Sequence, residues 1–135
     1  MNRLLAVALI PALTLVAIAS AVAFTKKDAE PRQAHSVFFT LKDNSPEARA
    51  EFVKSCQKYL TGHEGAVSVS FGTIAEDVVE PNVSVRDFDI SLLVVFENKE
   101  AGQKYLVSPR HLQFVKENKE KFAKVRVFDT YLAPE

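Results

Sequence analysis

The sequence predicts an α+β protein with a ferredoxin-like fold, in which helices cover one face of an antiparallel four-stranded sheet. Segments with the alternating pattern of strands stand at both ends of the region from residue 35 onward. Segments with helical spacing separate the first strand from the second and the third from the fourth, where each makes a crossover. The resulting order, βαββα(α)β, is that of a split βαβ unit.

The first strand and the first helix have clear boundaries. Residues 35–41 are rich in β-branched and aromatic side chains, and their odd-numbered positions form one face. A helix should follow and run to about Thr61, because residues 44–47 supply a capping residue, a proline for the first turn and an acidic residue. Its buried stripe is predicted to contain Ala48, Phe52, Val53, Cys56, Tyr59 and Leu60.

A second strand and a long connection follow. Val67, Val69 and Phe71 alternate with serines before Gly72, which predicts a half-buried strand with these three side chains on one face. Residues 73–87 are too long and irregular for a tight hairpin, so we expect an exposed loop there. The pattern does not indicate whether this loop has a function of its own.

Residues 88–96 have the strongest strand pattern in the chain. Their even-numbered positions, from Phe88 to Phe96, should form one face, and Asp89, Ser91, Leu93 and Val95 the other. This second face is too apolar to be fully exposed to water. Together with Phe38 and Phe128 it would leave a large apolar patch on a monomer, so we expect a homodimer that packs sheet on sheet.

The last third of the chain should form two helices and a strand. Asn98 is expected to cap a helix through about Val107, and Ser108 a second helix that reaches about Phe122. Residues 125–132 then alternate as the final strand.

Tyr105 and His111 stand on either side of the break between these two helices. Pro109 disfavours helical backbone at Ser108 and fits the first position of a new helix. On one unbroken helix, with a rotation of ~100° per residue, side chains six residues apart would lie on different faces. The break therefore allows the phenol and the imidazole to converge on one pocket.

The N-terminal region predicts export. A charge-free apolar run, residues 4–23, ends in a small-x-small pattern that suits signal peptidase, so we interpret residues 1–23 as a cleaved signal peptide. A retained membrane anchor formed by residues 4–23 is the alternative. Residues 24–34 are polar and lack periodicity, which indicates a flexible tether, and the domain comprises residues 35–135. The expected location is periplasmic or secreted.

Charge and cysteine content narrow the range of partners. Removal of Arg3 with the signal leaves 16 of the 17 basic residues against 17 acidic ones, without a basic stripe, so we expect no nucleic-acid partner. We also expect no membrane partner after cleavage. The single cysteine, Cys56, excludes an intrachain disulfide and, from its helical spacing with Phe52 and Leu60, is favoured as a buried small hydrophobe.

With this element order, the chain resembles the stress-responsive α/β-barrel (Dabb) domain family over residues 35–132. The resemblance rests on the opening of the first strand at residues 35–39, Gly72, residues 88–92, and the pattern Tyr105-x-x-Ser-Pro-x-His111-x-x-Phe114. It implies ferredoxin-like subunits that pair into a dimeric α/β barrel, and a stress-associated role.

The resemblance extends distantly to olivetolic acid cyclase, a branch that folds a linear polyketide into an aromatic ring. Tyr105 and His111 match the tyrosine and histidine of that branch, which implies His111 as a base and Tyr105 as a hydrogen-bond donor to a developing enolate. The sequence departs from the branch at Ser108 and at Asp89 or Ile90, where the cyclase pattern has further histidines.

Three functions remain open at this point. The first is binding of a small apolar or aromatic molecule between sheet and helices, the second is cyclase-like or lyase-like proton transfer by Tyr105 and His111, and the third is a purely structural dimer. His35 and His111 would be satisfied structural histidines in the third case, and His63 is expected to be exposed. No cofactor or metal is expected, although His35, His111 and Asp89 would make a conceivable zinc site. The candidate ligand-binding residues are His35, Phe39, Ile90 and Phe114.

Overall fold

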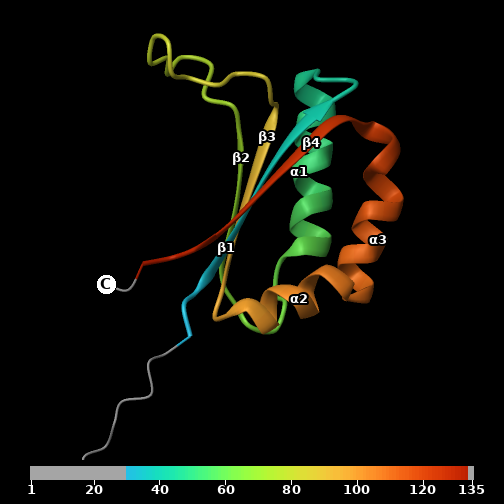
Figure 1. Cartoon of the computed structure of the whole chain (residues 1–135). Coiled ribbons are helices and arrows are strands. Elements are labelled where there is room, and N and C mark those ends of the chain that lie inside the picture. The colour runs from blue at the N-terminus through green and yellow to red at the C-terminus, as the bar shows by residue number, and fades with distance from the viewer. Residues whose placement is uncertain (1–29, 134–135) are drawn as a thin grey trace, which may run out of the picture.

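The computed structural model describes residues 30–133 and has the predicted ferredoxin-like fold (Figure 1). One antiparallel sheet has the strand order β2-β3-β1-β4, and the helices lie on one side of it. In chain order, the elements are β1 (Gln33–Leu41), α1 (Pro46–Leu60), β2 (Ala66–Thr73), β3 (Ile90–Phe96), α2 (Lys99–Val107), α3 (Pro109–Asn118), the short 3-10 helix η1 (Lys119–Lys121) and β4 (Phe122–Tyr131).

The helices begin at the capping residues that the sequence indicates. The side chain of Ser45 accepts a hydrogen bond from the backbone N–H of Ala48 at 3.3 Å, and Asn98 accepts one from Ala101 at 2.9 Å. Each cap satisfies one of the backbone donors that a helix leaves free in its first turn. The positions at which these two helices begin are therefore marked by local sequence signals.

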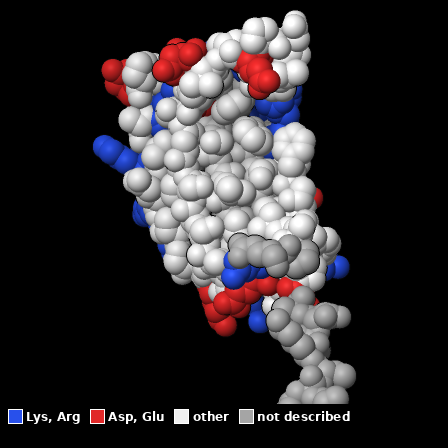
Figure 2. Space-filling model, turned by 90° about the vertical axis from the view of Figure 1, so that its left-hand side faces the viewer, with Lys and Arg blue, Asp and Glu red and all other residues white. Residues whose placement is uncertain are grey.

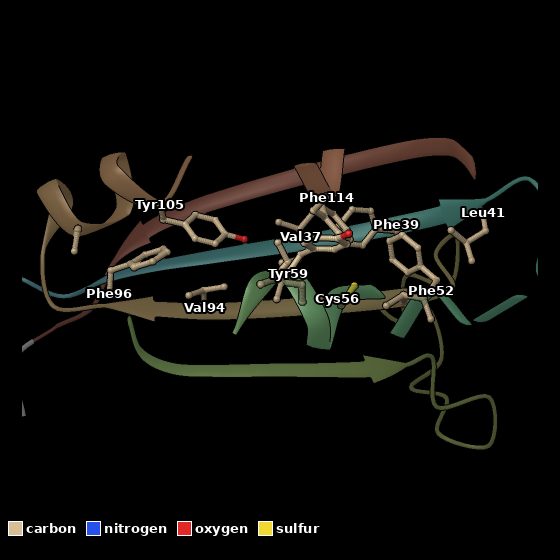
Figure 3. Close-up of a cluster of buried hydrophobic side chains, with 14 residues drawn as sticks. Val37, Phe39, Leu41, Phe52, Cys56, Tyr59, Val94, Phe96, Tyr105 and Phe114 are labelled. Carbon is tan, nitrogen blue, oxygen red and sulfur yellow. The ribbon is translucent and has the colours of Figure 1, made fainter. Parts of the chain in front are cut away.

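The core lies between the sheet and the helices (Figure 3). It is one continuous cluster of apolar side chains from β1, β3 and all three α-helices, and several of its rings make edge-to-face contacts. Its buried members are Val37, Phe39, Leu41, Phe52, Cys56, Tyr59, Leu60, Ile90, Leu92, Val94, Phe96, Ala101, Tyr105 and Phe114.

The predicted faces at the start of β3 are wrong for two residues. Phe88 lies on the helix-free side, with its ring centroid 5.0 Å from that of Phe38, whereas Asp89 is buried on the helix side. The carboxylate of Asp89 accepts hydrogen bonds from the backbone of Leu41 at 2.8 Å and from Arg49 of α1 at 2.9 Å. These partners, which sequence periodicity does not reveal, reverse the alternation just before Ile90.

Val67 also departs from its predicted face. The register of β2 against β3 shifts between Ala66 and Ser68, so Val67 is the extra residue of a bulge and is exposed, while Val69 and Phe71 pack against the core. The final strand begins three residues earlier than expected, at Phe122.

The predicted signal peptide, residues 1–23, and most of the predicted tether lie outside the described residues. Within residues 30–133, no helix has the length and hydrophobicity needed to cross a membrane.

Candidate functional site

Tyr105 of α2 is the centre of a cluster that contains every histidine of the sequence. The centroid of its ring lies 4.7 Å from that of His111, 4.8 Å from that of His63 and 6.0 Å from that of His35. Tyr105 itself is 2% exposed. We call these four residues the Tyr–His cluster.

The break between α2 and α3 brings Tyr105 and His111 together. Ser108 has extended backbone and serves both as the last cap of α2 and as the first cap of α3, with Pro109 at the start of α3. Its hydroxyl accepts a hydrogen bond from the backbone N–H of His111 at 3.3 Å. Because the chain turns here, the two rings meet although they are six residues apart.

His111 has its ring orientation fixed by the end of α2. Its Nδ1 lies 3.0 Å from the carbonyl oxygen of Leu106, and a carbonyl can only accept, so Nδ1 carries the proton and Nε2 keeps the lone pair. Burial lowers the pKa of His111, an effect that the hydrogen bond to Leu106 opposes and that His35 and His63 reinforce. The imidazole is therefore neutral at pH 7 and can act as an acceptor or base.

His35 is held by a carboxylate across the sheet. Its Nδ1 lies 2.8 Å from Oδ1 of Asp129, the residue opposite it in the pairing of β1 with β4. Because a carboxylate accepts, Nδ1 of His35 donates, which leaves Nε2 as the acceptor nitrogen when the ring carries one proton. Asp129 also accepts a longer hydrogen bond, 3.3 Å, from Gln33. His35 and His111 thus have the same tautomer and lie against the same phenol.

His63 is half-buried in this cluster, so its predicted exposure is wrong. Its Nε2 donates to the carbonyl oxygen of Tyr59 at 2.8 Å, and its Nδ1 faces the hydroxyl of Ser108 at 3.4 Å. Gly62, with a φ of 66°, turns the chain after α1 so that His63 packs against the edge of Tyr105. Both ring nitrogens of His63 thus have protein neighbours.

The hydroxyl of Tyr105 is buried and has no hydrogen-bond partner. In Figure 3 it points away from α2 toward the middle of the core cluster. Burial raises the pKa of Tyr105 well above its ordinary value, so the phenol stays protonated and remains a donor. A buried donor without a partner costs about 1–3 kcal/mol, which makes this hydroxyl the most unusual polar group of the site.

The remaining candidate residues lie elsewhere in the core. Phe39, Ile90 and Phe114 are buried members of the core cluster, and Phe39 packs against Phe52 at 5.0 Å between ring centroids. Figure 3 shows Phe39 and Phe52 toward one end of the cluster and Tyr105 with Phe96 at the other. The structure therefore groups His35 with Tyr105 and His111, and it places the two phenylalanines and the isoleucine in the packed interior.

The zinc alternative does not fit this geometry. Asp89 is engaged with Arg49 and Leu41, and within residues 30–133 no group of three or more histidine, cysteine or acidic side chains is arranged to hold a metal ion.

Sequence reasoning missed Asp129 and the contact of His63. Asp129 lies on the alternating face of β4 that also carries Val127, but its meeting with His35 depends on the pairing register of two strands far apart in the chain. His63 follows the end of α1, and only the packing of α1 against the α2–α3 junction brings it to Tyr105.

The sheet face without helices is a second candidate surface. Figure 2 shows an uncharged central area on this face, with the charged side chains near its rim. Phe38, Phe88 and Phe128 form a row of edge-to-face contacts there, and Phe128 is 52% exposed. Together with Val85 and Arg126 they line a pocket of about 320 Å³.

The fold and the Tyr–His cluster together define a ferredoxin-like α+β domain with polar groups held between sheet and helices. Comparison with protein families gives a match to the Stress responsive A/B Barrel Domain, Dabb, over residues 34–132. The chain therefore belongs to the Dabb family. None of the curated proteins matches it.

Solved structures with this fold include three informative neighbours. A Dabb family protein from Mesorhizobium loti is 20% identical, with a TM-score of 0.65 and coverage of 78% of this chain and 100% of the other. A dimeric ferredoxin-like protein from Thermobifida fusca is 12% identical, with a TM-score of 0.62 and coverage of 76% and 92%. Hydroxynitrile lyase from Passiflora edulis is 18% identical, with a TM-score of 0.62 and coverage of 79% and 97%. At these identities the likeness concerns the fold alone.

Proposed function

We propose that this protein binds a small apolar or aromatic molecule at the Tyr–His cluster, with Tyr105, His111 and His35 as its polar contacts. The observation that carries the proposal is the Tyr105 hydroxyl, which is buried without a partner on a ring that packs against three imidazoles. Native proteins leave few buried donors unsatisfied, and such a donor often has a role in binding or catalysis. The hydroxyl is closed off from water, so a ligand reaches it only when a neighbouring side chain moves.

The hydrogen-bond donors and acceptors of the cluster indicate which polar groups a ligand would need. Tyr105 offers a donor, and His35 and His111 each offer an Nε2 acceptor once their Nδ1 protons are engaged. A largely apolar molecule with one acceptor and one or two hydroxyl groups would satisfy all three. The surrounding side chains are aromatic and aliphatic, which favours a ring or a short hydrocarbon chain.

Binding can be tested with the mature chain, residues 24–135. Native mass spectrometry would identify small molecules that copurify, and thermal-shift assays with phenols and aromatic ketones would measure their binding. We expect Tyr105→Phe to weaken binding about tenfold while the protein remains folded. The proposal fails if no compound stabilises the wild type more than the Tyr105→Phe variant.

A homodimer through the helix-free face is part of the same proposal. Support comes from the row of exposed aromatic rings and from the dimeric neighbour of Thermobifida fusca. On the helix-free face, the side chains of the two edge strands are complementary in size. β4 presents the large Phe128, whereas β2 presents the small residues Ser68, Ser70 and Gly72. A twofold axis parallel to the strands would set β4 of one copy over β2 of the second, so that large side chains meet small ones.

The oligomeric state tests this part of the proposal directly. We expect the wild type to sediment as a dimer at micromolar concentration and Phe128→Ser to sediment as a monomer. A soluble wild-type monomer under these conditions would contradict the proposed interface.

Acid–base catalysis is the second candidate function, and the pairing of Tyr105 with His111 favours it. Nε2 of neutral His111 would accept a proton from a ligand hydroxyl or an acidic carbon, while Tyr105 would donate a hydrogen bond to the oxygen that gains charge. The reaction could resemble that of the hydroxynitrile lyase neighbour or a cyclase related to olivetolic acid cyclase. Turnover of cyanohydrins or linear polyketides should vanish in His111→Ala and persist in Leu112→Ala. Turnover that survives His111→Ala unchanged would exclude His111 as the base.

Export after cleavage at residue 23 and a stress-associated role complete the proposal. Export rests on the apolar N-terminal run and its small-x-small end, and the stress role rests on the description of the family. N-terminal sequencing of the protein purified from its host distinguishes a cleaved chain that begins near Phe24 from a retained anchor.

A further inference from the structure

The loop between β2 and β3, residues 74–89, has a defined shape although it contains neither helix nor strand. Arg86 joins its two limbs, because its guanidinium donates to the carbonyl oxygens of Glu76 at 2.9 Å and Val78 at 3.2 Å. At the tip, Pro81 and Asn82 occupy the two central positions of a turn, and the φ of Asn82 is 68°. These are the residue preferences of a type II turn, which fixes the tip locally.

The same loop is attached to the body of the domain at both limbs. Glu76 forms an ion pair with Arg49 of α1 at 2.9 Å. Asp87 lies 3.0 Å from Lys124 and 2.7 Å from Arg126, both on β4. A loop held by this many polar contacts presents its apolar side chains in fixed positions.

Those apolar side chains face the solvent. Four valines of the loop are between 56% and 68% exposed: Val78, Val79, Val83 and Val85. A well-ordered loop gains nothing in a monomer from four exposed valines, and ordered loops with apolar surfaces are a common form of binding element.

The position of the loop connects these valines to the helix-free face. Figure 1 shows the loop projecting beyond the end of the sheet on the side away from the helices. Val85 lines the 320 Å³ pocket together with Phe38, Phe88 and Phe128, so the loop and the aromatic row form one continuous apolar surface. Whatever covers the sheet face must also meet the loop.

We infer that the loop is a dimerisation arm whose valines pack against a second copy of this chain. The inference rests on the proposed homodimer and extends it. A twofold axis parallel to the strands keeps the loop ends of both copies at the same end of the interface, so the two arms lie close to each other. The acidic residues Glu76, Asp77 and Glu80 oppose an anionic membrane or a nucleic acid as the occupant.

Sedimentation equilibrium of three proteins tests the inference. The triple variant Val78→Ser, Val79→Ser, Val83→Ser should dissociate about a hundredfold more readily than the wild type, because three partly buried valines are lost per copy. The matched control, Val107→Ser with Leu112→Ser, removes equally exposed side chains from the helix side and should dimerise like the wild type. If the triple variant dimerises with the same affinity as the control, the loop does not contribute to dimerisation, and the inference of an arm is refuted while the proposed sheet-face dimer is not. A monomeric wild type would overturn both.

Cross-linking provides an independent measurement. Cys56 is the only cysteine of the sequence and is buried, so Val79→Cys introduces the one accessible thiol. We expect mild oxidation to yield a disulfide-linked dimer of Val79→Cys and none of Val107→Cys. Equal cross-linking of the two variants, or association of the wild type with lipid vesicles through the valines, would refute the second copy as the occupant.

Discussion

Removal of the buried hydroxyl of Tyr105 is expected to stabilise the protein, whereas most substitutions in a protein core destabilise it. Tyr105→Phe keeps the ring in the core and removes only the oxygen, which has no hydrogen-bond partner. Burial of an unpaired donor costs about 1–3 kcal/mol, and no bond is broken by its removal. We therefore expect the free energy of unfolding to rise by about 1 kcal/mol. For a domain of about 100 residues this corresponds to a gain of about 4–8 °C in melting temperature.

Tyr59 supplies a matched control for that measurement. Its ring is also in the core, but its hydroxyl donates to Glu117 at 2.7 Å, so Tyr59→Phe should lower the free energy of unfolding by about 1 kcal/mol. Urea denaturation followed by circular dichroism measures both variants in the absence of ligand. The reasoning would be refuted if Tyr105→Phe were destabilised as much as Tyr59→Phe, because the Tyr105 hydroxyl would then have a partner in the unliganded protein.

Three further predictions concern charge and protonation. Arg49→Met deprives the buried carboxylate of Asp89 of its positively charged partner, which lies 2.9 Å away, and urea denaturation should register a loss of about 3 kcal/mol in the free energy of unfolding. Burial lowers the pKa of His111 in the folded protein, so as the pH falls the unfolded chain is protonated at this histidine before the folded protein is. The free energy of unfolding should therefore decrease as the pH drops below about 6.5, and it should decrease less steeply in His111→Asn. Burial raises the pKa of Cys56 to about 12, so iodoacetamide should label its thiol only after unfolding.

The fold could be predicted from the sequence because its signals are local. Side-chain alternation marks each strand, and the capping residues Ser45, Asn98 and Ser108 mark where each helix begins. The break at Ser108-Pro109 also predicted that the rings of Tyr105 and His111 can meet, since a local change of chain direction is enough to bring them together.

The rest of the site could not be predicted because it depends on packing between distant segments. Asp129 meets His35 through the pairing register of β1 with β4, and His63 meets Tyr105 through the docking of α1 against α3. The reversal at Phe88 and Asp89 has the same origin, since Arg49 lies forty residues away on α1. One sequence contains no information on such pairings.

The two candidate surfaces share one strand pairing, which constrains how substitutions can act on them. His35 faces Asp129 on the helix side, and its neighbour Ser36 faces Phe128 on the helix-free side. A slip of one residue between β1 and β4 would exchange the two faces and destroy both surfaces together. A substitution that keeps the register, such as Phe128→Ser, changes only the helix-free side because successive side chains of a strand point in opposite directions. Loss of the dimer in that variant should therefore leave ligand binding at Tyr105 intact, and a joint loss would mean that the dimer itself shapes the ligand site.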